Sequence, residues 1–380
     1  MLSDGRPEAT LAYKLLHASW SLVFLQAAIA CVGFAMLYSA ANGSWEPWAQ
    51  TQMYRFAAGF AIMLGVAVVD IRTWMRHAYT LYGLGIVLLL VVELYGVVGM
   101  GAQRWIDLGV ITLQPSEPMK IFLILALARY FHGAALEDVR QPLFLLVATL
   151  IVAVPVLLVV KQPDLGTGAI LAMIGAALFL LGGVPGWLFF AGGGLGLASL
   201  PVIWQFLHPY QKERVMIFLN PQSEPLGSGY HITQSKIALG SGGVFGKGFL
   251  EGSQSHLNFL PEKQTDFIFT MLAEEFGLVG ALGLFFLYAL VIVLGFVIAF
   301  RCRHQFGRLL ALGVTTNFFL YTFINIAMVT GVVPVVGVPL PLVSYGGTAM
   351  LTIMFGFGLL MSAHIHRDVP VSRHGAVAED

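Results

Sequence analysis

The chain has 380 residues, of which 58% are hydrophobic and 11% are charged, and its formal net charge is +0. With a mean hydropathy of +0.82, it is too apolar for a soluble domain, and we predict an all-α polytopic membrane protein. The balanced charge gives no indication of a nucleic-acid partner. The two cysteines, Cys31 and Cys302, offer neither a disulfide framework nor metal-ligand spacing.

The N-terminal residues 1–20 carry charges but no short apolar core with a small-residue cleavage site, so we expect no removable signal peptide. A spanning helix needs about 20 mostly apolar residues, and ten segments meet this criterion. Their approximate limits are 19–40, 52–70, 78–99, 118–132, 142–160, 165–184, 186–206, 265–299, 307–330 and 345–365. The fourth is short, and the eighth is long enough to tilt or to contain a break. We expect one integral membrane domain over residues 1–380.

The orientation follows from basic residues near the span ends, which favour the cytoplasm. One side receives both termini and most of these residues: Lys14, Arg72, Arg76, Arg129, Arg140, Arg301, Arg303, Arg308 and Arg367. We predict that this side is cytoplasmic. The opposite side receives the one long loop, residues 207–264, which we expect to be an ordered, partly interfacial cap with a short surface helix around residues 232–239.

Basic residues on the outer side depart from this rule. They are Arg104, Lys120, Lys161, Lys212, Arg214, Lys236, Lys247 and Lys263. Those in the long loop can equally be explained as part of a translocated segment, for which the orientation rule is weak. Three others lie in short connections or at span ends, each near an acid: Arg104 with Asp107, Lys120 with Glu117, and Lys161 with Asp164. The Glu117–Lys120 spacing suits a structural ion pair as well as a ligand contact.

Basic residues at lipid depth indicate a cavity for an anionic head group on an apolar tail, because Arg and Lys bind phosphate oxygens. The outer start of the eighth span reads PEKQTDFIFTMLAEEFG and carries five charges. Alone, Asp266 would be a helix cap, but Glu262 and Lys263 beside it favour a functional site with a general base. Glu274 and Glu275 are predicted to lie about 12 Å deeper by helix rise and to form structural pairs.

The last outer connection reads GVVPVVGVPLPLVSYGGTAM. Its prolines and glycines predict non-helical backbone at membrane depth, which is tolerated only where protein or a cavity covers it. Ser344 and Tyr345 are therefore candidate site residues. The alternative is a re-entrant packing element without ligand contact.

Six motifs follow one another along the chain: QRWIDLGVITLQPSEPMK, KQPDLGTG, QKERVMIFLNP, GYHITQSKIALGSGG, FLPEKQTDFIFTMLAEEFG and GVPLPLVSYGG. On these motifs the chain resembles the RodA/FtsW family, the SEDS peptidoglycan glycosyltransferases, over essentially all ten spans. The sequence LPEKQTDFIF is similar to the corresponding motif of the RodA branch of the family, which acts in cell elongation.

The resemblance implies polymerisation of lipid II, a disaccharide-pentapeptide on undecaprenyl pyrophosphate, at the periplasmic face of the bacterial inner membrane. It also implies that Asp266 is the general base of an inverting reaction and that a class B penicillin-binding protein is a partner. A divalent cation, magnesium or manganese, would fit between pyrophosphate and Asp266, although no metal motif is visible. The expected substrate contacts are Arg104, Lys120, Lys161, Asp164, Lys212, Arg214, Gln234, Lys236, Glu262, Lys263, Ser344 and Tyr345.

Two other classes of function stay open. A transporter or lipid flippase also uses charged cavities and broken spans, but it needs a path to both membrane faces. A non-catalytic scaffold for the transpeptidase would tolerate replacement of Asp266.

Overall fold

The structure is a computed structural model of the chain. It describes residues 10–99, 102–107, 109, 112–135, 137–207, 209–220, 228–257 and 262–371. The segment used for the signal-peptide prediction lies partly outside these ranges, as do parts of the predicted long loop. Within them, the chain is built almost entirely from helices, which confirms the all-α prediction.

Ten helices occupy the positions of the ten predicted spans. They are α2 (Trp20–Ala40), α3 (Ala49–Val68), α4 (Ile71–Tyr95), α5 (Ser116–His132), α6 (Pro142–Lys161), α7 (Leu165–Leu181), α8 (Trp187–Phe206), α12 (Ile268–Arg301), α13 (Gln305–Val329) and α14 (Gly347–Ile365). Among the described residues, seven of these helices are long and apolar enough to cross a membrane: α2, α3, α4, α6, α12, α13 and α14. The chain is therefore a multi-pass membrane protein.

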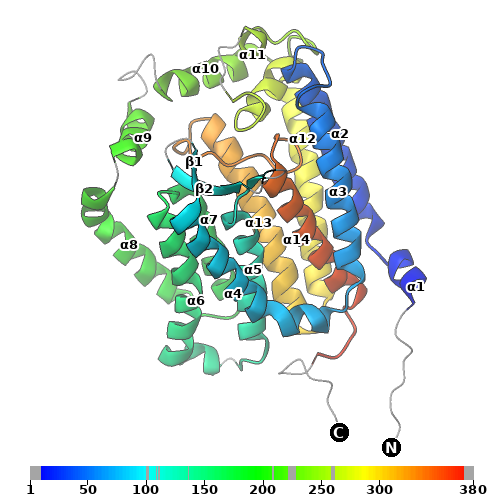
Figure 1. Cartoon of the computed structure of the whole chain (residues 1–380), viewed down its shortest axis with the longest axis vertical. Helices are drawn as coiled ribbons and strands as arrows, with labels where there is room; N and C mark the ends of the chain where they lie inside the picture. The colour runs from blue at the N-terminus through cyan, green and yellow to red at the C-terminus, as the bar shows by residue number, and fades with distance from the viewer. Residues whose placement is uncertain are drawn as a thin grey trace, which may run out of the picture.

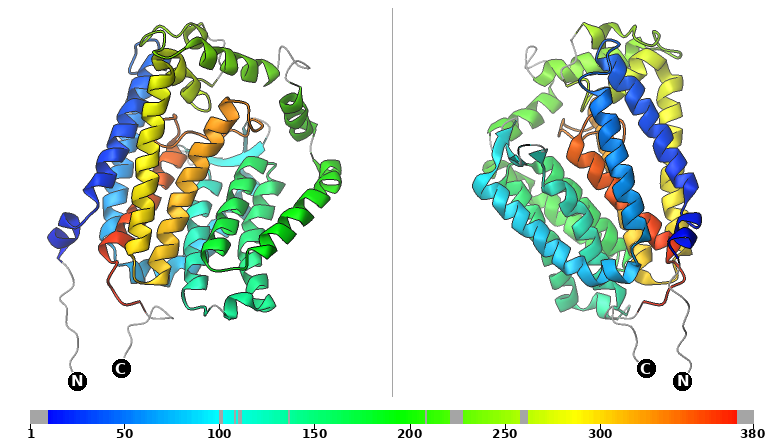
Figure 2. Two further views of the ribbon diagram at one scale, coloured as in Figure 1. Left: turned by 180° about the vertical axis from the view of Figure 1, so that it is seen from behind. Right: turned by 45° about the vertical axis from the view of Figure 1, so that its right-hand side comes forward.

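The remaining elements lie at the two ends of the bundle. Helix α1 (Leu11–Leu16) marks one end. Helices α10 (Ser228–Ser241) and α11 (Ser253–His256) lie over the other, which we call the loop end, and α9 (Pro209–Leu219) lies at the side of the bundle between α8 and α10 (Figures 1 and 2). Helix α10 contains the short helix predicted around residues 232–239. A short 3-10 helix spans Asp138–Arg140.

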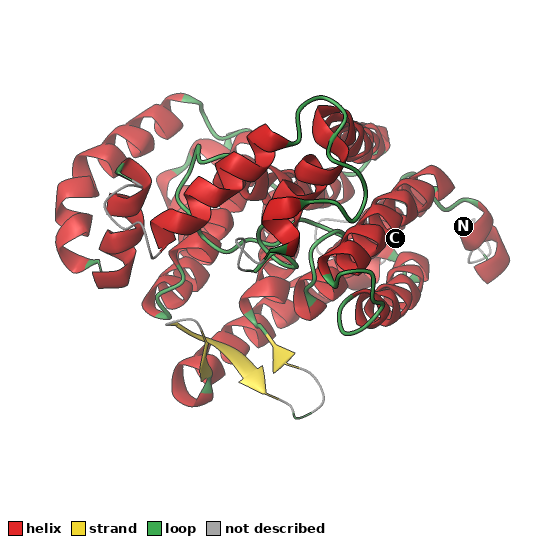
Figure 3. Cartoon of the chain, turned by 90° about the horizontal axis from the view of Figure 1, so that it is seen from above, coloured by secondary structure: helices red, strands yellow, loops and turns green. Residues whose placement is uncertain are grey.

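The connection between α4 and α5 forms a small antiparallel sheet, where the sequence predicted only an outer loop. Its strands are β1 (Val97–Gly99), β2 (Ala102–Asp107) and β3 (Thr112–Leu113), in the order β1-β2-β3. Figure 3 shows the strands at the edge of the bundle when it is viewed from above. Strands this short carry too few alternating residues to give a pattern in the sequence.

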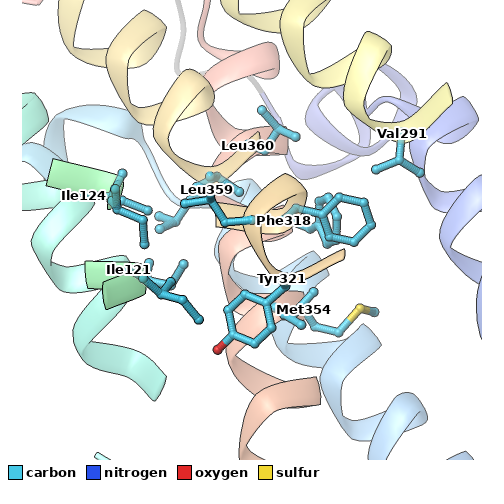
Figure 4. Close-up of a cluster of buried hydrophobic side chains, with 14 of the residues drawn as sticks. Ile121, Ile124, Val291, Phe318, Tyr321, Met354, Leu359 and Leu360 are labelled. Atoms are coloured by element: carbon cyan, nitrogen blue, oxygen red, sulfur yellow. The ribbon is translucent and has the colours of Figure 1, made fainter. Parts of the chain in front are cut away.

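The centre of the bundle is formed by α5, α13 and α14, with α12 packed against α13. Figure 4 shows aliphatic and aromatic side chains from all four helices meeting there: Ile121, Ile124, Val291, Phe318, Tyr321, Met354, Leu359 and Leu360. Helices that are apolar on every side pack inside a membrane protein. Because lipid tails are as apolar as these side chains, close packing rather than exclusion from water stabilises the association.

Helix α12 is broken at Gly277, whose φ of 65° and ψ of -160° are not helical. The rings of Phe269 and Phe285 are 5.5 Å apart, whereas an unbroken helix would separate these two positions by about 24 Å along its axis. Residues 268–276 therefore fold back against the turns that follow the break. Glycine accommodates this positive φ without the steric cost of a Cβ atom.

The loop 242–248 satisfies the backbone groups that the break releases. Lys247 N donates to Glu274 O and Gly248 N to Glu275 O, both at 3.0 Å. In return, Leu278 N donates to the carbonyl of Gly243 at 3.0 Å. These bonds replace the intrahelical hydrogen bonds that every helix end lacks, so loop and break form one unit.

Candidate active site

Asp266 lies just before the first residue of α12, in the part of the chain that precedes the break at Gly277. The Asn325 side chain, on α13, donates from Nδ2 to the carbonyl of Asp266 at 3.0 Å and to that of Val338 at 2.7 Å. Gly337 has a φ of 73°, and a methyl group added there would lie 3.4 Å from Asp266 Oδ2. The connection between α13 and α14 thus lies directly against the Asp266 carboxyl group.

The surroundings of Asp266 determine its protonation. Burial and, to a smaller extent, the negative charge of Glu262 together raise the pKa of the Asp266 carboxyl group to about 6, although Arg214 and Arg104 oppose the shift. A base whose pKa is close to the working pH is the most effective proton acceptor. Asp266 is only partly buried, so an incoming hydroxyl group can approach it.

A cavity of about 140 Å³ lies next to these two arginines. Arg104 comes from β2, Asp164 from the start of α7, and Gln211 and Arg214 from α9, while Val335 and Val336 supply part of an apolar wall. Arg214 Nη1 donates to the carbonyl of Val335 at 3.1 Å. Two guanidinium groups against an apolar wall suit an anionic group attached to an apolar chain.

The ion pairs around this cavity differ from those expected from sequence proximity. Arg104 Nε lies 3.4 Å from Asp164 Oδ2, not beside Asp107. Lys161 pairs with Glu93 of α4 at 2.9 Å and is 70% exposed. Asp164 instead caps α7, accepting from Thr167 N and Thr167 Oγ1. The turn between α6 and α7 carries Asp164 away from Lys161 and towards β2, so the pairing expected from sequence was wrong.

Lys120 lies in the core and not at the cavity. It is 1% exposed, its Nζ is 2.7 Å from Glu117 Oε1, and it also donates to the Tyr321 hydroxyl. That hydroxyl in turn donates to Glu117, and Figure 4 shows its oxygen pointing away from the aliphatic side chains around the ring. This position favours the structural ion pair over a substrate contact.

The other expected contacts from the long loop lie outside the cavity lining. Lys212 Nζ is 3.5 Å from the carbonyl of Gln205, and Lys236 is exposed, with its ammonium beside Gly331. Gln234 is partly buried on α10. Along α9, residues 211 and 214 share a face that residue 212 does not, which explains why Lys212 is not in the cavity.

Glu262 and Lys263 have different environments. Glu262 is exposed, and its Oε2 accepts from Gln264 Nε2 at 3.3 Å and from Thr265 Oγ1 at 3.2 Å. Lys263 is buried, which lowers the pKa of its ammonium group, and its Nζ donates to the carbonyl of Ser255 at 3.0 Å. The negative charge of Glu262 therefore raises the pKa of Asp266. Lys263 instead holds the loop in place through its hydrogen bond to the carbonyl of Ser255.

Ser344 and Tyr345 hold the chain that leads to Asp266. Ser344 Oγ donates to the carbonyl of Thr265 at 2.6 Å and accepts from Leu340 N at 2.7 Å. Tyr345 N donates to the carbonyl of Gln264 at 2.8 Å. Ser344 is buried, so its position favours a scaffolding role.

Glu274 and Glu275 lie at the loop end and not deeper than Asp266, because the chain reverses at Gly277. Glu274 accepts from Lys247 Nζ at 2.7 Å and from Ser255 Oγ at 2.6 Å. Glu275 Oε1 accepts from Ser39, in the last turn of α2, at 2.5 Å. The expected structural pairing is present, but the expected depth was wrong.

Three residues at the site were not singled out from the sequence. Gln211 is 5% exposed and lines the cavity. It could have been found from its spacing, because residues three apart, such as Gln211 and Arg214, lie on one face of a helix. Asn325 is a buried amide in an apolar helix, which is a signal of function in membrane proteins. Gly337 becomes recognisable only once its positive φ is known.

Within the part of the chain that the structure describes, no three His, Cys, Asp or Glu side chains are grouped so as to hold a metal ion. Magnesium often binds through one or two carboxylates and phosphate oxygens, so a phosphate-bearing substrate would have to complete the site.

Comparisons with known proteins agree with this architecture. Residues 15–369 match the FtsW/RodA/SpoVE cell cycle protein family. The chain is 45% identical over 357 residues to "Peptidoglycan glycosyltransferase MrdB" of Escherichia coli K12, covering 92% of this chain and 95% of that one. It is 38% identical over 319 residues to the protein of the same name from Helicobacter pylori 26695, covering 80% of each.

Two solved structures show the same fold. One is described as "Structural coordination of polymerization and crosslinking by a peptidoglycan synthase complex", with a TM-score of 0.78, 31% identity, and coverage of 93% of this chain and 99% of that one. The other is the rod shape determining protein RodA of Thermus thermophilus, with a TM-score of 0.71, 28% identity, and coverage of 93% and 98%. The chain therefore belongs to the FtsW/RodA/SpoVE family of cell cycle proteins.

Proposed function

We propose that this peptidoglycan glycosyltransferase of the RodA branch polymerises lipid II during cell elongation, with Asp266 as the general base. The observation that carries the proposal is the Asp266 carboxyl group, with a pKa of about 6 and two arginines nearby that line a cavity. The relatives named as peptidoglycan glycosyltransferases support the choice of substrate.

In this reaction the 4-hydroxyl of the acceptor sugar attacks the anomeric carbon of the donor's muramyl sugar. Asp266 takes the hydroxyl proton as the new carbon–oxygen bond forms. The bond from the anomeric carbon to the phosphate oxygen breaks, and its electron pair leaves with undecaprenyl pyrophosphate. Attack from the opposite face inverts the configuration from α to β. Arg104 and Arg214 stabilise the negative charge on the leaving pyrophosphate.

The site faces the periplasm of the bacterial inner membrane in this proposal. The arginines expected on the cytoplasmic side gather at the α1 end of the bundle, for example Arg72, Arg301 and Arg367, which flank α4, α12 and α14. The elements that surround Asp266 and the neighbouring cavity, which are β2, α9 and the connection between α13 and α14, lie towards the loop end. Basic residues beside spans favour the cytoplasm, which supports this orientation. A class B penicillin-binding protein is the proposed partner, and the relative solved as a synthase complex supports it.

The decisive experiment compares purified wild type and Asp266→Asn in liposomes supplied with lipid II. Loss of a general base is expected to lower the rate of glycan chain growth by about 10²–10⁴-fold, with an unchanged melting temperature. Asp368→Asn is the control, because Asp368 is an exposed carboxylate at the α1 end. Wild-type chain growth by folded Asp266→Asn would refute the assignment. Movement of lipid II across the membrane without polymer would favour the transporter alternative.

A further inference from the structure

Arg55, on α3, is a cation without a counter-charge near the candidate site. Its Nη1 atom is buried and has no hydrogen-bond partner, and within the described ranges no carboxylate lies within ion-pairing distance of its guanidinium group. By contrast, Arg104, Lys120, Lys161 and Lys247 each contact a carboxylate. Arg55 as a residue is only partly buried, but a buried donor atom of a charged group that lacks a partner is costly, so the Nη1 atom favours a bound anion.

The guanidinium group is held in place before any ligand binds. Arg55 Cζ lies 4.4 Å from the centroid of the Tyr345 ring, a distance typical of a cation–π contact. One turn earlier on α3, Gln52 donates to the carbonyl of Ser344 at 2.9 Å and accepts from Gly346 N at 3.4 Å. Stacking and hydrogen bonds therefore fix α3 against the residues that precede α14.

The neighbouring helix end adds positive charge. A methyl group at Gly347, the first residue of α14, would lie 3.3 Å from Arg55 Nε. The first turn of α14 has no acidic residue and no side-chain cap, and the Thr348 hydroxyl is directed to the carbonyl of Thr112. A helix N-terminus repels cations and attracts anions. Arg55 in this place is unfavourable unless an anion lies between them.

The connection between α13 and α14 links this position to the base. Val335 and Val336 line the cavity that contains Arg104 and Arg214. Gly337 lies against Asp266, and Tyr345 lies under Arg55. This one segment therefore contacts the cavity with Arg104 and Arg214, then Asp266, and then Arg55.

We infer that Arg55, with Tyr345 and the first turn of α14, binds the pyrophosphate of a second lipid-linked substrate. This inference rests on the proposed function, because polymerisation joins two lipid-linked molecules and each carries a pyrophosphate. The cavity with Arg104 and Arg214 holds one of them. Arg55 holds the other, with its planar guanidinium group donating to phosphate oxygens while its face stays on Tyr345.

The test counts bound lipid II by native mass spectrometry in nanodiscs of phosphatidylcholine. The Asp266→Asn background prevents turnover, so binding is measured apart from catalysis. Two molecules of lipid II are expected per protein, falling to one when Arg55→Gln is added. Arg76→Gln, which removes an exposed arginine towards the α1 end, should leave two. Two bound molecules with Arg55→Gln would overturn the inference.

Kinetics and stability separate ligand binding from a structural role. In the active enzyme, Arg55→Gln is expected to raise the lipid II concentration for half-maximal rate at least tenfold. Arg55→Lys is expected to raise it less, because lysine keeps the positive charge but lacks the planar guanidinium group that stacks on Tyr345. Without substrate, the melting temperature of Arg55→Gln should be equal to or above that of wild type, since an unpaired charge is removed. A lower melting temperature with unchanged kinetics would show a structural role and refute the inference.

A phospholipid phosphate offers the same chemistry as the pyrophosphate. The binding measurement is therefore repeated with phosphatidylglycerol in the nanodisc. An unchanged count of two lipid II molecules supports the inference. If phosphatidylglycerol displaces one lipid II in the presence of Arg55 and not in Arg55→Gln, the occupant is a membrane phospholipid and the inference is overturned. Polymerisation by Asp266→Asn would refute the proposed function. The Arg55 inference would then be judged from the lipid II concentration for half-maximal rate in the Arg55 variants, which does not depend on Asp266→Asn being inactive.

Discussion

Asp266 and Glu274 are eight residues apart in the same charged stretch, yet their surroundings are opposite. Glu274 is fully buried and accepts hydrogen bonds from Lys247, Ser255 and the backbone of Gln254. Asp266 as a residue is only partly buried, and Gly337, which has no side chain, lies against its carboxyl group. A carboxylate whose acceptor sites are filled holds a structure together, whereas one with acceptor sites available can take a proton from a substrate.

If Glu274 took part in the reaction, the contrast between a structural Glu274 and a catalytic Asp266 would not hold. Glu274→Gln is expected to destabilise the protein by about 2–3 kcal/mol, because hydrogen bonds to a buried charge are lost. Thermal unfolding should show a lower melting temperature, while the rate per folded molecule stays unchanged. Glu251→Gln, which changes an exposed acid in the connection between α10 and α11, is the matched control and should leave both quantities unchanged. A reduced rate in folded Glu274→Gln would contradict the structural assignment.

Gly337→Ala is expected to have the next largest effect. This variant tests the packing against the Asp266 carboxyl group. Alanine at a φ of 73° costs about 1–2 kcal/mol, and its methyl group would meet Asp266 Oδ2. If the strain displaces the carboxyl group, the rate of chain growth should fall about tenfold, since 1.36 kcal/mol corresponds to one factor of ten.

Gly243→Ala is the control for Gly337→Ala. Gly243 also has a positive φ, 55°, and no atom lies within 4 Å of an added methyl group. It should lower the melting temperature without lowering the rate. Equal rate losses in both variants would show that backbone strain alone, and not contact with Asp266, causes the effect.

The pH profile is expected to show the smallest effect. Asp266 must be deprotonated to act as a base, so kcat/KM for lipid II should rise with pH through an apparent pKa of about 6. Glu262→Gln removes a negative neighbour, which lowers the pKa of Asp266 and moves this limb to lower pH. Arg214→Gln removes a positive neighbour and moves it to higher pH. Shifts in the same direction for both variants would contradict this electrostatic arrangement.

The helices and the position of Asp266 just before one of them were predictable, because apolar segments of about 20 residues can be recognised directly in the sequence. The Glu117–Lys120 pair is present as the spacing suggested, but the pairs of Arg104 and Lys161 did not follow from proximity in the sequence. Arg104 contacts Asp164, 60 positions later, rather than Asp107, because the turn before α7 and the strand β2 bring them together. Such contacts depend on how connections fold, and no periodicity in the sequence encodes that.

The depth of Glu274 and Glu275 was wrong for a local reason. A helix rise of about 1.5 Å per residue assumes an unbroken helix, and one residue, Gly277, removes that condition. The glycine was visible in the sequence, but glycines are common in membrane helices. Only the hydrogen bonds from the loop 242–248 distinguish this one from a glycine that merely allows close packing.

The break at Gly277 also has a consequence for how α12 fits the bilayer. As one helix, its 34 residues would rise about 51 Å, far more than the hydrocarbon core of about 30 Å, and a strong tilt or bilayer distortion would follow. Residues 278–301 alone rise about 36 Å, which suits a crossing with modest tilt. The preceding residues then return towards the loop end without adding to the hydrophobic length.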